Sequence, residues 1–101
     1  MPTVILLAGA ENDTLSIFAK LEARSAVSAD AFYHTLDAAL QQLANHAESA
    51  PVFAGHIRRL VMHGYPFGIF YALENDRLFV HAVLDLRQNP EAIHRRLGDL
   101  S

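Results

Sequence analysis

The sequence predicts a single α+β domain over residues 1–101. An N-terminal strand and an antiparallel helical hairpin are expected to pack on a mainly antiparallel β-sheet, which ends in a three-stranded meander and a short closing helix. Apolar residues recur at helical spacing in the first half of the chain and at every second position in the second half. The turns between the later segments are short enough to impose antiparallel neighbours. The predicted order of elements is therefore β-α-α-β-β-β-α.

The first half is interpreted as one strand followed by two helices. Thr3 to Ala8 is a continuous apolar run with β-branched residues at its start, which is typical of a buried strand. A first helix is predicted from Ala10 to Arg24, capped by Asn12 or Asp13. A second helix is predicted with Ser28 as its N-cap. Its apolar stripe consists of Phe32, Leu36, Ala39, Leu40, Leu43 and Ala47. Because the link between them is short, we expect the two helices to lie antiparallel.

The second half is interpreted as three strands and a helix. Residues 48–55 have the composition of a loop. Alternating patterns then predict strands at 57–63, 67–73 and 78–87, joined by turns at 63–65 and 74–76. Asn89 and Pro90 are suited to the cap and first position of a closing helix that extends to Leu100.

The stretch YPFGIFY, Tyr65 to Tyr71, is the most distinctive of the sequence, because it holds a proline and a glycine among aromatic and aliphatic residues. Proline is tolerated at the first residue of a strand, where we place Pro66. Gly68 falls on the face opposite Phe67, Ile69 and Tyr71. Its missing side chain would leave room for a neighbour such as Phe79 or a helix.

Composition excludes several classes of function. The chain has no cysteine, so disulfides, thiolate metal sites and a cysteine nucleophile are ruled out. No apolar run is long enough for a membrane span, and Pro2 to Gly9 is too short for a secretory signal and lacks its basic start. We therefore expect a cytoplasmic protein without membrane contact.

Charge is divided unevenly along the chain. Residues 1–50 carry two basic residues against six acidic ones, whereas residues 51–101 carry six arginines against five acidic residues. The basic surface that could face an acidic partner or a phosphate is therefore expected from the second half. Because the formal net charge is -3, strong direct binding to nucleic acid is not expected.

The six histidines include no pair at the i, i+2 or i, i+4 spacing that brings ligands together, so no metal site is predicted, and no motif indicates a cofactor. Asp85 and Arg87 are predicted to project from one face of the last strand together with His81. Such a set could move protons or hold a phosphate, but a salt bridge on a solvent-exposed face is the favoured interpretation. Tyr71 is expected in the core, with its hydroxyl at the rim.

Two segments carry a resemblance to a known family. These segments run from Arg58 to Tyr71, ending in YPFGIFY, and from Glu74 to Pro90. Together they resemble the ParE/RelE superfamily of bacterial toxins, especially its ParE-like branch of plasmid stabilisation proteins. The first half is similar to the family's two helices. The matching positions there are Ala10, Asp13, Ile17, Leu21, Ala31, Phe32, Leu36 and Leu43.

The resemblance implies a toxin that is neutralised by an antitoxin encoded beside it. ParE-like members poison DNA gyrase, whereas RelE-like members cleave mRNA on the ribosome. This sequence has Asp85 where the family often has histidine and Gln88 where it often has a second arginine, while Arg87 matches. We therefore expect a ParE-like toxin that is a binding protein and no enzyme. The alternatives are a RelE-like endoribonuclease and an inactive or repurposed relative that only binds a partner.

The candidate site follows from the same resemblance. We expect Arg58, Arg59, Arg77 and Arg87 to form the surface that meets the antitoxin or a target such as DNA gyrase. No residue is assigned a catalytic role on this interpretation. In the nuclease alternative, Arg58, Arg59 and Arg87 would hold phosphate and His63 or His81 would move a proton. A homodimer formed along an exposed edge strand is left open.

Overall fold

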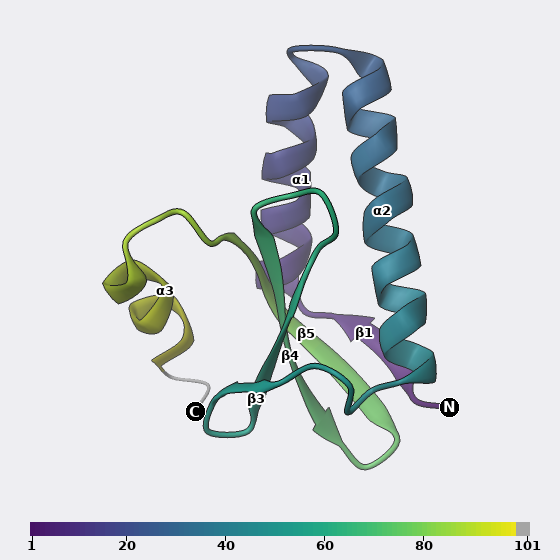
Figure 1. Ribbon diagram of the computed structural model, residues 1–101, viewed down its shortest axis with the longest axis vertical. Helices are drawn as coiled ribbons and strands as arrows, with labels where there is room; N and C mark the ends of the chain where they lie inside the picture. Colours follow the sequence, from purple (N-terminus) through teal and green to yellow (C-terminus); the bar gives the residue numbers. More distant parts are fainter. Residues whose placement is uncertain (99–101) are drawn as a thin grey trace.

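A computed structural model describes residues 1–98 and shows a sheet with helices on both faces (Figure 1). The chain runs in the predicted order, with one additional short strand. None of the helices in this range is long and apolar enough to cross a membrane. The elements are β1 (Thr3–Leu6), α1 (Ala8–Glu22), α2 (Ala26–Asn45), β2 (Val52–Ala54), β3 (Ile57–Val61), β4 (Phe67–Glu74), β5 (Arg77–Asp85) and α3 (Pro90–Leu97).

The sheet has five strands in the order β1-β5-β4-β3-β2. Strands β3, β4 and β5 form the predicted antiparallel meander, and β1 pairs with β5 in parallel. The α+β prediction is thus confirmed. The loop predicted at residues 48–55 was partly wrong, because β2 lies within it and pairs with the start of β3. Three residues are too few to reveal an alternating pattern in the sequence.

The two faces of the sheet carry separate clusters of buried side chains. The helical hairpin of α1 and α2 covers one face and α3 covers the other. We call these the hairpin face and the α3 face. The hairpin face contributes Leu60, Phe67, Ile69, Tyr71, Leu78, Val80 and Val83 to a core with Phe32, Leu36, Ala39 and Leu43 of α2. The α3 face contributes Ile57, Phe70, Ala72, Ala82 and Leu84 to a core with Ile93 and Leu97 of α3.

Both helices of the hairpin begin earlier than predicted. Helix α1 begins at Ala8 after Leu7, which provides no side-chain cap, so the prediction of Asn12 or Asp13 as a cap was wrong. Ser25 caps α2, because its hydroxyl accepts the N–H of Ser28 at 3.1 Å. Ser28 therefore lies in the first turn of α2 and is one of the residues whose N–H needs a cap.

A bulge in β5 changes which residues face the hairpin. Tyr71 of β4 pairs with Val80 but Phe70 pairs with Ala82, so His81 is an extra residue in β5. As a result Val80 and Val83 both point into the hairpin core although they are three residues apart. The prediction that His81 shares a face with Asp85 was therefore wrong, because it assumed unbroken alternation.

Asp13 of α1 links three elements at this bulge. Its carboxylate accepts the backbone N–H of Val83 at 3.0 Å and two hydrogen bonds from the Arg96 guanidinium of α3 at 3.0 and 2.8 Å. Strand β1 pairs with β5 only as far as Val80, so α1 takes over the edge of β5 beyond that point. Gly9 permits the close approach, since a Cβ there would lie 3.0 Å from Nη2 of Arg96.

The YPFGIFY stretch forms a turn and a strand, as predicted. Pro66 was predicted as the first residue of the strand and instead directly precedes β4, where its carbonyl accepts the N–H of Leu86 at 2.7 Å. A Cβ on Gly68 would lie 2.9 Å from Cδ2 of Leu86 and 3.2 Å from Cγ of Arg59. The space left by the glycine is thus filled by Leu86 and Arg59, and the prediction of Phe79 or a helix there was wrong.

The closing helix α3 begins as predicted. Asn89 accepts the N–H of Glu91 with its side-chain oxygen at 2.8 Å, and Pro90 occupies the first turn. The helix was predicted to extend to Leu100. Positions 99 and 100 of that prediction lie outside the described residues.

Replacing Asp13 should destabilise the protein more than replacing its ion-pair partner. Asp13→Ala leaves the N–H of Val83 without its acceptor and should lower the free energy of unfolding by about 1–3 kcal/mol. Arg96→Gln removes only a partly exposed ion pair and should cost less than about 1 kcal/mol. Urea denaturation followed by circular dichroism measures both, and equal losses would show that the Val83 hydrogen bond contributes nothing.

Candidate partner-binding surface

Arg58 and Arg59 are neighbours in β3 and therefore point to opposite faces of the sheet. Arg58 is half-buried on the hairpin side, and its Nη1 donates to the carbonyl oxygens of Glu48 at 3.1 Å and Ala50 at 2.7 Å. These bonds hold the segment that follows α2. Arg58 thus has a structural contact that uses part of its guanidinium.

Arg59 lies on the α3 face, above an aromatic side chain. Its Cζ is 5.3 Å from the ring centroid of Phe53 in β2, a cation–π distance. The same ring stacks on His94 of α3 with centroids 5.1 Å apart and packs edge-on against Phe70. Phe53 therefore joins β2, the sheet and α3, and Arg59 covers this junction.

Arg77 and Arg87 lie at opposite ends of β5. Arg77 begins the strand, opposite Glu74 at the exposed β4–β5 turn. Arg87 follows the other end and forms the predicted salt bridge with Asp85, at 2.8 Å between Nη2 and Oδ2. The hydrogen bonds from Arg87 hold the pKa of the Asp85 carboxyl below its usual range.

The four predicted arginines are thus spread over both faces and both ends of the sheet. Of these, Arg87 lies beside two cations of α1, Lys20 and Arg24. It lines a hollow of about 190 Å³ that we call the hairpin pocket. The residues of the hairpin pocket are Ile17, Lys20, Leu21, Arg24, Phe67, Asp85 and Arg87.

The sequence prediction missed Lys20 and Arg24 as candidate partner contacts. It expected the basic surface from the second half of the chain, whereas two of the three cations of the hairpin pocket come from the first half. A signal was present, because residues 17, 20, 21 and 24 follow the i, i+3, i+4, i+7 spacing of one helix stripe. The pairing of that stripe with Arg87 depends on the fold and is invisible in the sequence.

The two histidines considered for proton transfer lie apart. His63 is exposed in the β3–β4 turn and lines a hollow with His34 and Thr35 of α2. His81 lies at the bulge of β5, where burial and then the nearby His56 lower its pKa. Within residues 1–98, no three acidic or histidine side chains converge in a group that could hold a metal ion.

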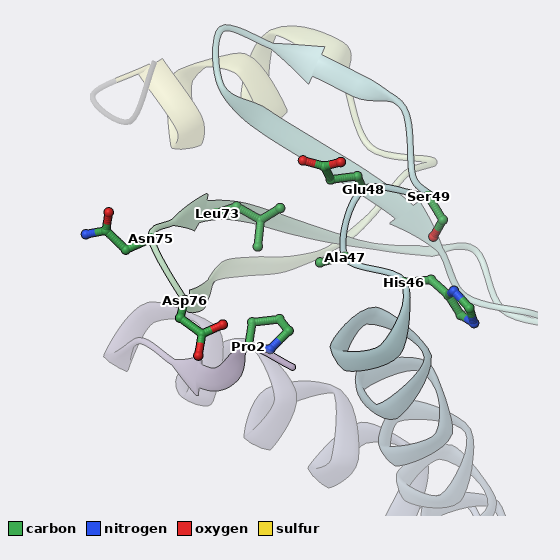
Figure 2. Close-up of a pocket in the computed structure, with 8 residues that line it drawn as sticks. All are labelled: Pro2, His46, Ala47, Glu48, Ser49, Leu73, Asn75 and Asp76. Atoms are coloured by element: carbon green, nitrogen blue, oxygen red, sulfur yellow. The ribbon is translucent and has the colours of Figure 1, made fainter.

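A wide hollow of about 520 Å³ lies between the end of α2, the residue before β1 and the β4–β5 turn (Figure 2). Tyr71 helps to shape it, because its buried hydroxyl donates to the carbonyl of Ala47 at 2.8 Å, and burial raises the pKa of that hydroxyl. Glu48 and Asp76 line the hollow and Arg58 does not. Its charged groups are therefore acidic, unlike those of the hairpin pocket.

Comparison with solved structures finds the same fold in a bacterial toxin–antitoxin system. A chain of the chromosomal ParDE TA system from P. aeruginosa superposes with a TM-score of 0.74, covering 86% of this chain and 98% of that one at 14% identity. This protein has the fold of a ParDE component. No protein-family model and no curated protein sequence matches the chain. The structural match thus supports the predicted fold and extends over most of the molecule.

Arg58 should matter for stability more than an exposed arginine does. Arg58→Gln removes both hydrogen bonds to the segment after α2 and should cost about 1–2 kcal/mol of unfolding free energy. Arg95→Gln, on the exposed side of α3, is the matched control and should stay within about 0.5 kcal/mol of the wild type. A cost at Arg58 no larger than that of the control would refute a structural role.

His81 should make the stability depend on pH. Its pKa is lowered in the folded state, so below its ordinary value of 6.5 the unfolded chain takes up a proton that the folded chain resists. The wild type should therefore lose stability relative to His81→Gln as the pH falls below that value. Thermal unfolding of both proteins between about pH 7.5 and 5 measures the difference in stability between them. A difference that stays constant with pH would show that the His81 ring is as well solvated in the folded state as in the unfolded chain.

Proposed function

We propose that this protein is the toxin of a type II toxin–antitoxin pair, that it is ParE-like, and that it acts in the cytoplasm by binding a protein target such as DNA gyrase. A cognate antitoxin would hold it inactive. The observation that carries the proposal is the superposition on a chain of the P. aeruginosa ParDE system over 86% of this chain. The family resemblance of YPFGIFY and of the Arg87 to Pro90 ending adds to it, since these segments form β4 and the connection from β5 to α3.

The arrangement of charges favours a binding protein over a nuclease. RNA cleavage needs cations and a proton-transferring group around one phosphate. Here Arg58 donates to backbone carbonyls, Arg87 is paired with Asp85, and Arg59 lies over Phe53. His63 and His81 are in different parts of the fold. The RelE-like alternative would require these groups to be brought together.

We keep Arg59, Arg77 and Arg87 as proposed contacts for partners. Arg58 remains a proposed contact through the exposed part of its side chain. Because they lie at separate places, one small partner domain would not reach all of them, whereas an extended antitoxin segment that wraps around the sheet could. Acidic residues in that segment would complement the arginines and raise the rate of association. A target such as DNA gyrase would then compete for part of the same surface.

Inducible expression in bacteria tests the proposal. We expect growth to stop and plasmid supercoiling to change, and we expect both effects to disappear when the product of the adjacent reading frame is co-expressed. The His81→Ala variant should be as toxic as the wild type, because no proton transfer is proposed. Normal growth and supercoiling at high expression would refute the proposal. Cleavage of ribosome-bound message that His81→Ala abolishes would instead support the endoribonuclease.

A further inference from the structure

The hairpin pocket combines an apolar floor with a cationic rim. Ile17 and Leu21 of α1 and Phe67 of β4 supply the apolar part. Lys20, Arg24 and Arg87 supply three of the eight basic side chains of a chain whose formal net charge is -3. The pocket is therefore a local region of positive potential on an acidic protein.

The one acidic group of the pocket is already engaged. Asp85 accepts hydrogen bonds from Nε of Arg87 at 3.1 Å, from Nη2 at 2.8 Å and from the backbone N–H of Arg87 at 2.9 Å. Within residues 1–98, neither Lys20 nor Arg24 forms a salt bridge. Lys20 is still close enough to help lower the pKa of Asp85. Three positive charges against one negative charge leave room for an occupant with one or two negative charges.

The size of the pocket limits what that occupant can be. At about 190 Å³ it is smaller than the roughly 300–1,000 Å³ typical of cofactor and drug-sized ligand sites. It suits one or two side chains. Phe67 and Leu21 would receive an apolar side chain, while the planar guanidinium of Arg24 and the ammonium of Lys20 would receive a carboxylate.

We propose that the hairpin pocket binds an acidic segment of a partner protein, in which a glutamate or aspartate side chain lies next to a large apolar one. The carboxylate meets Lys20 and Arg24, and the apolar side chain covers Ile17, Leu21 and Phe67. If the partner is the antitoxin, the inference rests on the proposed function, and the hairpin pocket is where one acidic residue of the antitoxin binds. Binding of an acidic and apolar peptide to the pocket can be tested on the isolated protein, whatever the partner is.

The geometry behind the pocket comes from the bulge of β5. Asp85 pairs with Phe67 across the strands, and the extra residue His81 places Asp85 on the side of α1. Without the bulge Asp85 would point to the α3 face, and Arg87 would have no counterpart in α1. Lys20 and Arg24, one helical turn apart, then complete the rim.

The test is a titration of the ¹⁵N-labelled full chain with the peptide acetyl-Leu-Glu-Ala-Leu-Glu-amide, followed by amide chemical shifts. We expect shifts centred on residues 17–24, 67 and 85–87, with saturation below about 10 mM peptide. The glutamine analogue, acetyl-Leu-Gln-Ala-Leu-Gln-amide, should bind at least about fivefold more weakly, because the charge-assisted hydrogen bonds are lost. Higher salt should weaken binding of the acidic peptide and leave the analogue unaffected.

Variants that lack cations of the hairpin pocket test whether the peptide binds there. The double variant Lys20→Gln/Arg24→Gln should bind the acidic peptide about tenfold more weakly than the wild type, and Arg24→Gln alone about threefold more weakly. Arg95→Gln removes a cation outside the pocket and is the matched control, which should bind like the wild type. The spectra themselves show whether each variant is folded.

Each other outcome overturns the proposal. These outcomes are no shift up to about 10 mM, shifts centred elsewhere, equal binding of the glutamine analogue, or unchanged binding by the double variant. Equal shifts with inorganic phosphate at the same ionic strength would assign the pocket to small anions instead. Growth arrest on expression tests the toxin proposal without reference to the pocket, and the titration needs no toxicity, so failure of one is distinguishable from failure of the other.

Discussion

The arrangement of the whole molecule depends on how α1 meets the edge of β5. Strand β1 covers β5 only as far as Val80, and beyond that point the strand bulges and needs another neighbour. The carboxylate of Asp13 supplies it by accepting the N–H of Val83, and the same carboxylate binds Arg96 of α3. An exposed strand edge with an unsatisfied N–H is costly, so this contact fixes α1, β5 and α3 relative to one another.

As a result, the basic side chains of the surface lie in separate regions. The bulge places Asp85 and Arg87 beside Lys20 and Arg24, whereas Arg59 lies over Phe53 on the opposite face and Arg77 lies at the far end of β5. A chain that is acidic in total thus presents, among its described residues, a compact cationic pocket with an apolar floor. This arrangement suits recognition of an acidic protein segment better than tracking of a nucleic-acid backbone, which needs a continuous basic groove.

The sequence predicted the order of the elements because their periodicities are regular over long segments. The stripe of α2 from Phe32 to Leu43, the alternation of β4 and the Asn89-Pro90 start of α3 are all local signals, and each is confirmed. The stripe was wrong at its end, because α2 stops at Asn45 and Ala47 lies in the turn that follows. The site was less predictable. The bulge at His81 interrupts an alternation that looks continuous in the sequence, and the meeting of Arg24 with Arg87 joins residues far apart in the chain. Arg58 was predicted at a partner surface. Its hydrogen bonds to the carbonyls of Glu48 and Ala50 were not predicted, because they depend on how the segment after α2 folds back beside β3.

The bulge of β5 and the pocket beside it are tested most directly by the nuclear Overhauser contacts that the side chains of Asp85 and Arg87 make in solution. The bulge predicts contacts with Ile17 and Leu21 of α1, because it turns this end of β5 toward the hairpin. Contacts with Phe53 or Ile93 on the α3 face would contradict it. They would show a strand without the bulge, and neither the hairpin pocket nor the link through Asp13 would then exist as described.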